Sequence, residues 1–170
     1  GIGTALGKDY SARGVPTKGR GKRTNEGLEI MYRLWTEDKV NFDGEFFQLN
    51  EATIAPKPVQ KPIPLWIGGV APAAVERTAK WATGWQAGIE TPEQIKPVVD
   101  AIKARATELG RHIPEDHYGG GFAFRFGSKT DPVAKTYIDR IERFLGKMPT
   151  DLQAIGDEQE MMELLLRYKE

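Results

Sequence analysis

The chain has 170 residues, and its 24 Lys and Arg balance 24 Asp and Glu, so the formal net charge is zero. This balance does not indicate a nucleic-acid or anionic-membrane partner. The absence of cysteine excludes disulfide scaffolds, zinc ribbons and thiol catalysis. Only two histidines are present, His112 and His117, so we expect solvated loop side chains there and no metal site. The composition favours a single cytoplasmic domain over residues 1–170, with no membrane span.

Glycines and cationic side chains open the chain, and we expect a loop there. Apolar residues at helical spacing then predict a helix over residues 18–36. Asp43–Gly44 lies between alternating apolar residues, which predicts a β-hairpin. Residues 55–64 carry four of the 11 prolines and are expected to be extended and polyproline-like.

The segment 64–77 predicts a buried strand, a glycine turn and a helix. Leu65, Trp66 and Ile67 form an apolar run that is typical of a strand covered on both faces. Gly68–Gly69 allow a sharp turn, and Pro72 suits the first helical position. Backbone N–H groups at the positive end of such a helix form a phosphate site. A tight structural turn with no ligand is the alternative.

The following segments alternate again between strand and helix. A short strand is expected over 84–88, followed by a helix that Thr91 and Gln94 cap reciprocally and Gly110 ends. Residues 118–126 predict a strand. Its phenylalanines at 122, 124 and 126 are expected in the core, and Arg125 on the opposite face, where it could bind an anionic substrate.

The last two helices have clear start signals. Asp131–Pro132 opens one helix, which Gly146 closes. Asp157 caps the other, with Glu160 as reciprocal partner. Between them we expect a loop.

Alternation of strands and helices predicts the α/β class, with a parallel sheet and helices outside. Three parallel strands cannot close a barrel, which needs eight strands and about 250 residues. The chain is therefore expected to form about half of one. Because it begins on glycine-rich sequence without a methionine, we expect a piece of a longer polypeptide.

An ordered set of segments over roughly residues 1–88 resembles the luciferase-like monooxygenase family. The segments are Gly1–Ile2–Gly3, Arg23–Thr24–Asn25–Glu26, Leu28–Glu29–Ile30, Leu34–Trp35, Phe42–Asp43–Gly44–Glu45–Phe46–Phe47, Pro56–Lys57–Pro58–Val59–Gln60, Trp66–Ile67–Gly68–Gly69 and Gly84–Trp85.

This resemblance implies a (β/α)8 TIM-barrel type of fold, here a partial barrel of about strands 4 to 7 with an inserted β-hairpin. It also implies FMN or the deazaflavin coenzyme F420 as cofactor. By position, the residues implied at the cofactor phosphate are Gly1, Gly3 and Thr4 in one turn and Gly68, Gly69, Val70 and Ala71 in the other. The family's usual catalytic histidine precedes this segment, so no catalytic residue is assigned.

The resemblance thus implies a flavin- or F420-dependent oxidoreductase or monooxygenase that acts on a small-molecule substrate. Two alternatives remain open. One is a non-catalytic flavin- or phosphate-binding protein. The other is an inactive fragment that needs a partner chain. Half a barrel leaves open sheet edges, so we expect a homo-oligomer or completion by further sequence.

Overall fold

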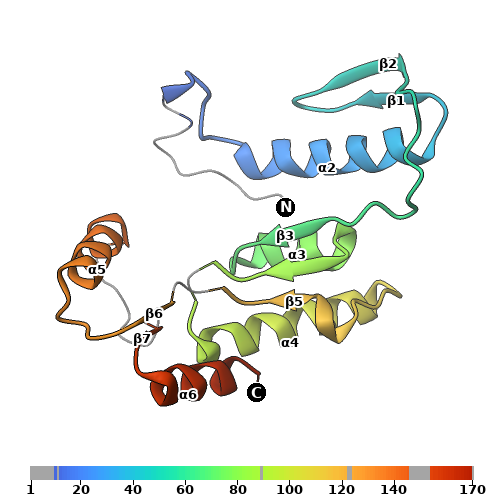
Figure 1. The fold of residues 1–170 in the computed structure, drawn as a ribbon. Helices are drawn as coiled ribbons and strands as arrows, with labels where there is room; N and C mark the ends of the chain where they lie inside the picture. Colours follow the sequence, from blue (N-terminus) through green and yellow to red (C-terminus); the bar gives the residue numbers. More distant parts are fainter. Residues whose placement is uncertain (1–9, 11, 89, 122–123, 146–153, 170) are drawn as a thin grey trace.

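The computed structural model describes residues 10, 12–88, 90–121, 124–145 and 154–169 (Figure 1). Parallel strands alternate with helices through the second half of the chain, and an antiparallel hairpin precedes them. This is the partial barrel with an inserted hairpin that the sequence predicts. Within the described residues, no helix is long and apolar enough to cross a membrane.

The first long helix and the hairpin form one unit. Helix α2 runs over Arg20–Thr36 and buries Leu28 and Ile30. Strands β1 (Val40–Asp43) and β2 (Gln48–Ala52) pair antiparallel, which confirms the predicted hairpin. The carboxylate of Glu26 on α2 accepts hydrogen bonds from the backbone N–H groups of residues 45, 46 and 47, at 2.9–3.1 Å. These bonds hold the hairpin loop on the helix.

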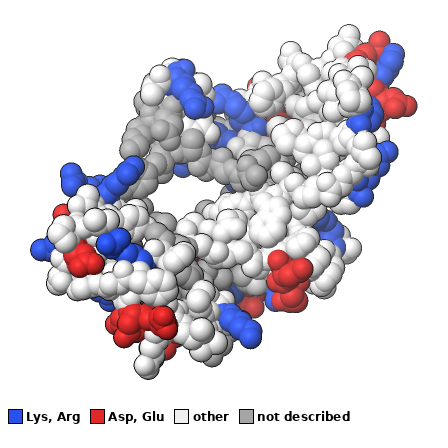
Figure 2. All heavy atoms as spheres, viewed as in Figure 1, with Lys and Arg blue, Asp and Glu red and all other residues white. Residues whose placement is uncertain are grey.

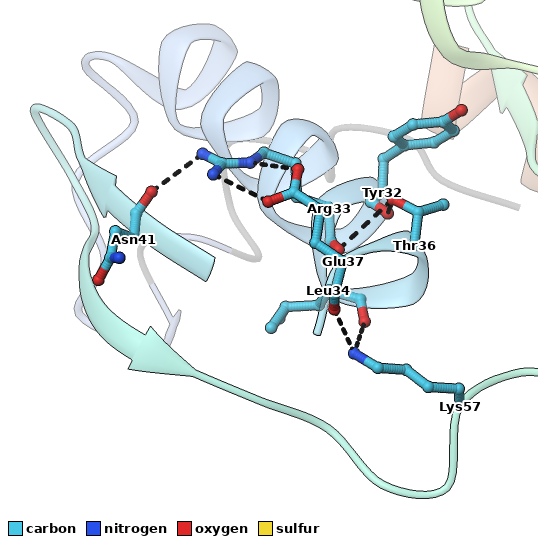
Figure 3. Close-up of polar contacts among 7 residues, drawn as sticks. All are labelled: Tyr32, Arg33, Leu34, Thr36, Glu37, Asn41 and Lys57. Carbon is cyan, nitrogen blue, oxygen red and sulfur yellow. Dashed lines mark hydrogen bonds and ion pairs between the residues drawn. The ribbon is translucent and has the colours of Figure 1, made fainter. Parts of the chain in front are cut away.

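The proline-rich segment 55–64 bends at residues 55–56 and 59–62, so the prediction of one extended strap is wrong. The peptide bonds before Pro56 and Pro62 are cis. Lys57 explains part of this path, because its ammonium donates to the carbonyl oxygens of Leu34, at 2.9 Å, and Glu37 (Figure 3). These carbonyls lie at the C-terminal end of α2, where a cation is favourable. A side chain that reaches back to the helix in this way fixes the segment against it.

Two strand–helix units follow as predicted. Strand β3 (Trp66–Gly68) leads to α3 (Pro72–Trp81), and β4 (Gly84–Gln86) leads to α4 (Pro92–Glu108). Strands β3 and β4 are parallel, with Trp66 opposite Gly84. The side chains of Trp85, Ile102 and Ile113 are buried together between the sheet and α4. Thr91 and Gln94 form the predicted capping box of α4.

The last part of the chain contains one strand that the sequence did not predict. A 3-10 turn (Glu115–His117) precedes β5 (Tyr118–Gly119), and β6 (Phe124–Phe126) lies in the same predicted stretch. Helix α5 (Pro132–Leu145) then leads to β7 (Ala154–Gly156), which pairs in parallel with β6. Strand β7 is the strand that the sequence did not predict. Its length of three residues in a predicted loop explains why the pattern missed it.

Strand β7 leads to the last helix, α6 (Glu158–Lys169). Asp157 and Glu160 cap it reciprocally, with both hydrogen bonds at 2.9 Å, as predicted.

The predicted burial of the phenylalanine row is wrong for its two described members. Phe124 is 68% exposed and Phe126 is 59% exposed; Phe122 lies outside the described residues. Their alternation is typical of a strand face that another layer covers, but no described part of the chain covers it. Arg125 lies beside them and forms an ion pair with Asp131 at 3.7 Å.

Candidate phosphate-binding site

The turn Gly68–Ala71 lies at the carboxyl end of β3 and leads into α3 (Figure 1). Gly69 has φ of 102°, a conformation that side chains disfavour. A Cβ atom at Gly68 would lie 3.0 Å from the carbonyl oxygen of Gln86, so the next strand leaves no room for one. Both glycines therefore have a structural reason to be there.

Helix α3 begins without a side-chain cap. Ala71 occupies the N-cap position with φ −66° and ψ 149°, and Pro72 is the first helical residue, as predicted. The N–H of Ala74 bonds to the Ala71 carbonyl at 2.7 Å. The backbone N–H groups that precede Ala74 have no partner within α3. The positive end of this helix is therefore available to an anion.

A buried tryptophan fixes the turn from the neighbouring strand. The indole N–H of Trp85 on β4 donates to the carbonyl oxygen of Gly69 at 3.0 Å. The Trp85 side chain is fully buried. The turn is thus held by the core of the sheet and does not depend on local contacts alone.

A cavity of about 290 Å³ opens beside this turn. The turn forms one side of it, and α2 contributes Thr24 and Leu28. Figure 2 shows that the molecule is hollowed on the side where β3 ends. The remaining lining residues come from β3, from α3 and from the loop after β4: Ile67, Ala74, Arg77 and Glu90.

Arg77 supplies the cation of this cavity. The structure places its side chain half-buried against α2. Its guanidinium donates to the side-chain oxygen of Asn25 at 2.6 Å and to the carbonyl oxygen of Gly21 at 3.1 Å. Burial lowers the pKa of Arg77 from its ordinary value. A guanidinium remains charged at neutral pH, so Arg77 is a fixed positive charge in the wall.

Glu90 brings a negative charge to the same cavity. Its carboxylate accepts the N–H of Gly88 at 2.6 Å. One carboxylate offsets the charge of one guanidinium, so the attraction for an anion depends on the N–H groups of the turn and helix α3. These groups act at short range and favour an oxyanion that fits against the glycines.

The first predicted turn, with Gly1, Gly3 and Thr4, lies outside the described residues. His112 is exposed as expected, but His117 is not a solvated loop residue. Its Nδ1 lies 2.7 Å from the carbonyl oxygen of Thr83, and its ring packs near Trp66. Within the described ranges, no group of acidic or histidine side chains could hold a metal ion.

Sequence reasoning assigned no binding role to Thr24, Arg77 or Trp85. The position of Arg77, three residues after Ala74 on the same helix, is the one local signal that could have placed it at the cavity. Thr24 lines the same cavity from α2, and Trp85 bonds to the turn from β4, so no local pattern could have placed either of them at the site.

A strand, a glycine turn and an uncapped helix at the carboxyl edge of a parallel sheet are the arrangement that α/β-barrel proteins repeat. The sequence matches the model of the luciferase-like monooxygenase family over residues 1–170. The chain therefore belongs to the luciferase-like monooxygenase family.

Curated relatives cover different activities. An uncharacterized protein of Mycobacterium tuberculosis is 38% identical over 115 residues, which are 67% of this chain and 39% of that protein. An FMNH2-dependent dimethylsulfone monooxygenase of Pseudomonas putida is 32% identical over 72% of this chain and 33% of its own length. An F420-dependent glucose-6-phosphate dehydrogenase of Nakamurella multipartita is 29% identical over 58% of this chain and 29% of its own length. The chain thus spans less than half of each relative.

Among solved structures, an F420-dependent secondary alcohol dehydrogenase in complex with an F420–acetone adduct matches with a TM-score of 0.72. The identity is 18%, and the match covers 94% of this chain and 56% of that protein. This likeness supports the fold, as a partial barrel.

Proposed function

We propose that this chain is part of a flavin- or F420-dependent oxidoreductase or monooxygenase, and that it binds the cofactor phosphate at Gly68–Ala71. The observation that carries the proposal is the uncapped start of α3 beside a cavity with Arg77 in its wall. One relative depends on FMNH2 and another on F420. Both cofactors carry phosphate, so one turn suits either of them.

The residues present fit the phosphate end of such a cofactor. Gly68 and Gly69 have no side chains between the backbone and the cavity, so a phosphate oxygen can approach the N–H groups closely. Asn25 and Gly21 hold the guanidinium of Arg77 in the same wall, where the carboxylate of Glu90 offsets its charge, so the N–H groups provide the net attraction. When bound, the cofactor supplies the redox chemistry, and this chain supplies binding and orientation.

Fluorescence titration of the purified chain with FMN, riboflavin and F420 tests this proposal. Riboflavin has the ring of FMN without its phosphate, so the difference between the two affinities isolates the phosphate contribution. We expect FMN to bind at least about tenfold more tightly than riboflavin, a difference of about 1.4 kcal/mol. Equal affinities for FMN and riboflavin would contradict the proposal. Failure of the chain to bind either cofactor, FMN or F420, would contradict it as well.

The second candidate is a chain that binds cofactor but turns over substrate only when further sequence or a partner chain completes the barrel. The exposure of Phe124 and Phe126 favours it, because an apolar strand face of this kind normally packs on another layer. Cofactor binding by the chain without oxygen uptake or F420 reduction would support this candidate. Turnover by the chain alone would exclude it.

A further inference from the structure

A second and larger cavity, of about 520 Å³, lies between the C-terminal half of α2, the bent proline segment and the end of α3. Leu65 and Thr83 also line it, and these residues directly precede β3 and β4. The cavity is therefore at the amino ends of the strands, whereas the turn Gly68–Ala71 is at the carboxyl end of β3. The three residues of β3 separate the two sites by about 10 Å of strand.

Aromatic side chains form the walls of this cavity. Tyr32 and Trp35 come from α2, and Trp81 ends α3. The rings of Tyr32 and Trp81 lie 5.6 Å apart with a tilt of 53°. Tyr32 is 46% exposed, and Figure 3 shows its ring on the side of α2 opposite to the guanidinium of Arg33. The aromatic surface is thus accessible to a planar ligand.

The charged groups of the lining are all cationic among the residues that the structure describes. Lys61, Lys80 and Arg111 line the cavity, and no described acidic residue does. In the described part of the chain, none of the three forms an ion pair with a carboxylate. The ammonium of Lys80 lies over the ring of Trp81, 4.9 Å from its centroid.

Arg111 is held in the wall by carbonyl groups. Its guanidinium donates to the carbonyl oxygens of Ala79 and Ala82, the latter at 2.7 Å. These carbonyls belong to the end of α3, so they orient the side chain without providing a full negative charge. Three cations beside an accessible aromatic wall leave a local excess of positive charge.

We propose that this cavity binds a small aromatic carboxylate. A planar apolar ring would pack against Tyr32 and Trp81, and the carboxylate would lie near Lys61, Lys80 and Arg111. The volume is within the range of small-molecule sites, about 300–1,000 Å³. The proposal is independent of cofactor binding, because it uses a different end of the sheet.

Two pairs of tryptophans make the test specific. Trp35 and Trp81 line the proposed site, whereas Trp85 bonds to the phosphate turn and Trp66 packs beside His117. In a ¹H–¹⁵N NMR titration of the chain with 2-naphthoate, we expect saturable shifts of the indole signals of Trp35 and Trp81 and little change of the other two. The neutral 2-naphthamide should bind at least about fivefold more weakly, since it lacks the charge.

Two kinds of variant separate the charge from the ring contact. Lys61→Gln and Lys80→Gln should each weaken 2-naphthoate about two- to fivefold, as expected for exposed charge pairs, and leave 2-naphthamide unchanged. Tyr32→Ala should weaken both ligands by about two- to tenfold through loss of ring packing. Lys129→Gln, an exposed lysine that does not line this cavity, is the control. Equal binding of acid and amide, shifts confined to Trp66 and Trp85, or no saturable binding would each overturn the proposal.

Discussion

The indole N–H of Trp85 lies 3.0 Å from the carbonyl oxygen of Gly69 and donates to it. This hydrogen bond joins the buried face of β4 to the turn that follows β3. It fixes the backbone at the point where α3 begins and where a phosphate would bind. A turn that is ordered before binding loses little conformational freedom when the ligand arrives.

Replacing Trp85 with phenylalanine should destabilise the chain. We expect the free energy of unfolding to fall by about 1–3 kcal/mol, from loss of the hydrogen bond and the smaller ring in a buried position. Urea unfolding followed by far-UV circular dichroism measures this change. Trp66→Phe is the matched control, since Trp66 is only partly buried and its indole makes no hydrogen bond among the described residues. A loss for Trp66→Phe equal to or greater than that for Trp85→Phe would contradict the role given to the bond.

Two glycines should respond in opposite directions to alanine. Gly69→Ala should cost about 1–3 kcal/mol, because φ of 102° is disfavoured for a residue with a Cβ atom. Gly27→Ala should raise stability by about 0.5–1 kcal/mol, because Gly27 lies inside α2 and a Cβ there meets nothing within 4 Å. Both values come from the same urea experiment. Stabilisation by Gly69→Ala would show that the turn has another conformation.

Glu26→Gln should loosen the hairpin loop. The change removes the charge that accepts three backbone N–H groups, so we expect a loss of about 1–3 kcal/mol. Hydrogen exchange of the amides at residues 45–47 should become faster. Glu29→Gln on the same helix is the control, because Glu29 makes no hydrogen bond within the described residues. Unchanged exchange in Glu26→Gln would mean that the carboxylate does not hold the loop.

The ion pair of Glu93 and Arg167 predicts a pH dependence of the contact between α4 and α6. Hydrogen bonding from Arg167, at 2.8 Å, lowers the pKa of Glu93 from 4.5 to about 2. A carboxyl whose pKa is lower in the folded chain stabilises the fold at pH values above its pKa in the unfolded chain. This contribution is lost as the pH falls from 4.5 to about 2. The melting temperature of the chain should therefore fall more steeply in this window than that of Glu93→Gln. Parallel curves would contradict the shift.

Local signals explain which elements the sequence could predict. The capping pairs Thr91–Gln94 and Asp157–Glu160 each lie within four residues, and both form as expected. The strand, turn and proline start at 66–72 were likewise predictable, because glycine and proline restrict the backbone by themselves.

Features that depend on distant residues were not predictable. The bonds of Arg77 and Trp85 at the site connect different elements, so only the fold brings their partners together. Burial of Phe124 and Phe126 was predicted from the alternation of apolar residues along the strand. Such alternation shows that one face of a strand is apolar, but it does not show what covers that face. The short strand β7 depends on pairing with β6 and has no pattern of its own.

The central claim is that the start of α3 binds the cofactor phosphate, and Ala71→Asp tests it most directly. Ala71 is exposed and has the backbone conformation of an N-cap residue. An aspartate there should cap the helix and keep or raise stability by about 1 kcal/mol, while its charge occupies the anion position. Ala71→Ser is the neutral control for the cap.

We predict that Ala71→Asp weakens FMN binding at least about tenfold, leaves riboflavin unchanged and so removes the preference for FMN. Ala71→Ser should retain most of that preference. Binding of FMN by Ala71→Asp with unchanged affinity would contradict the assignment of the phosphate to this turn.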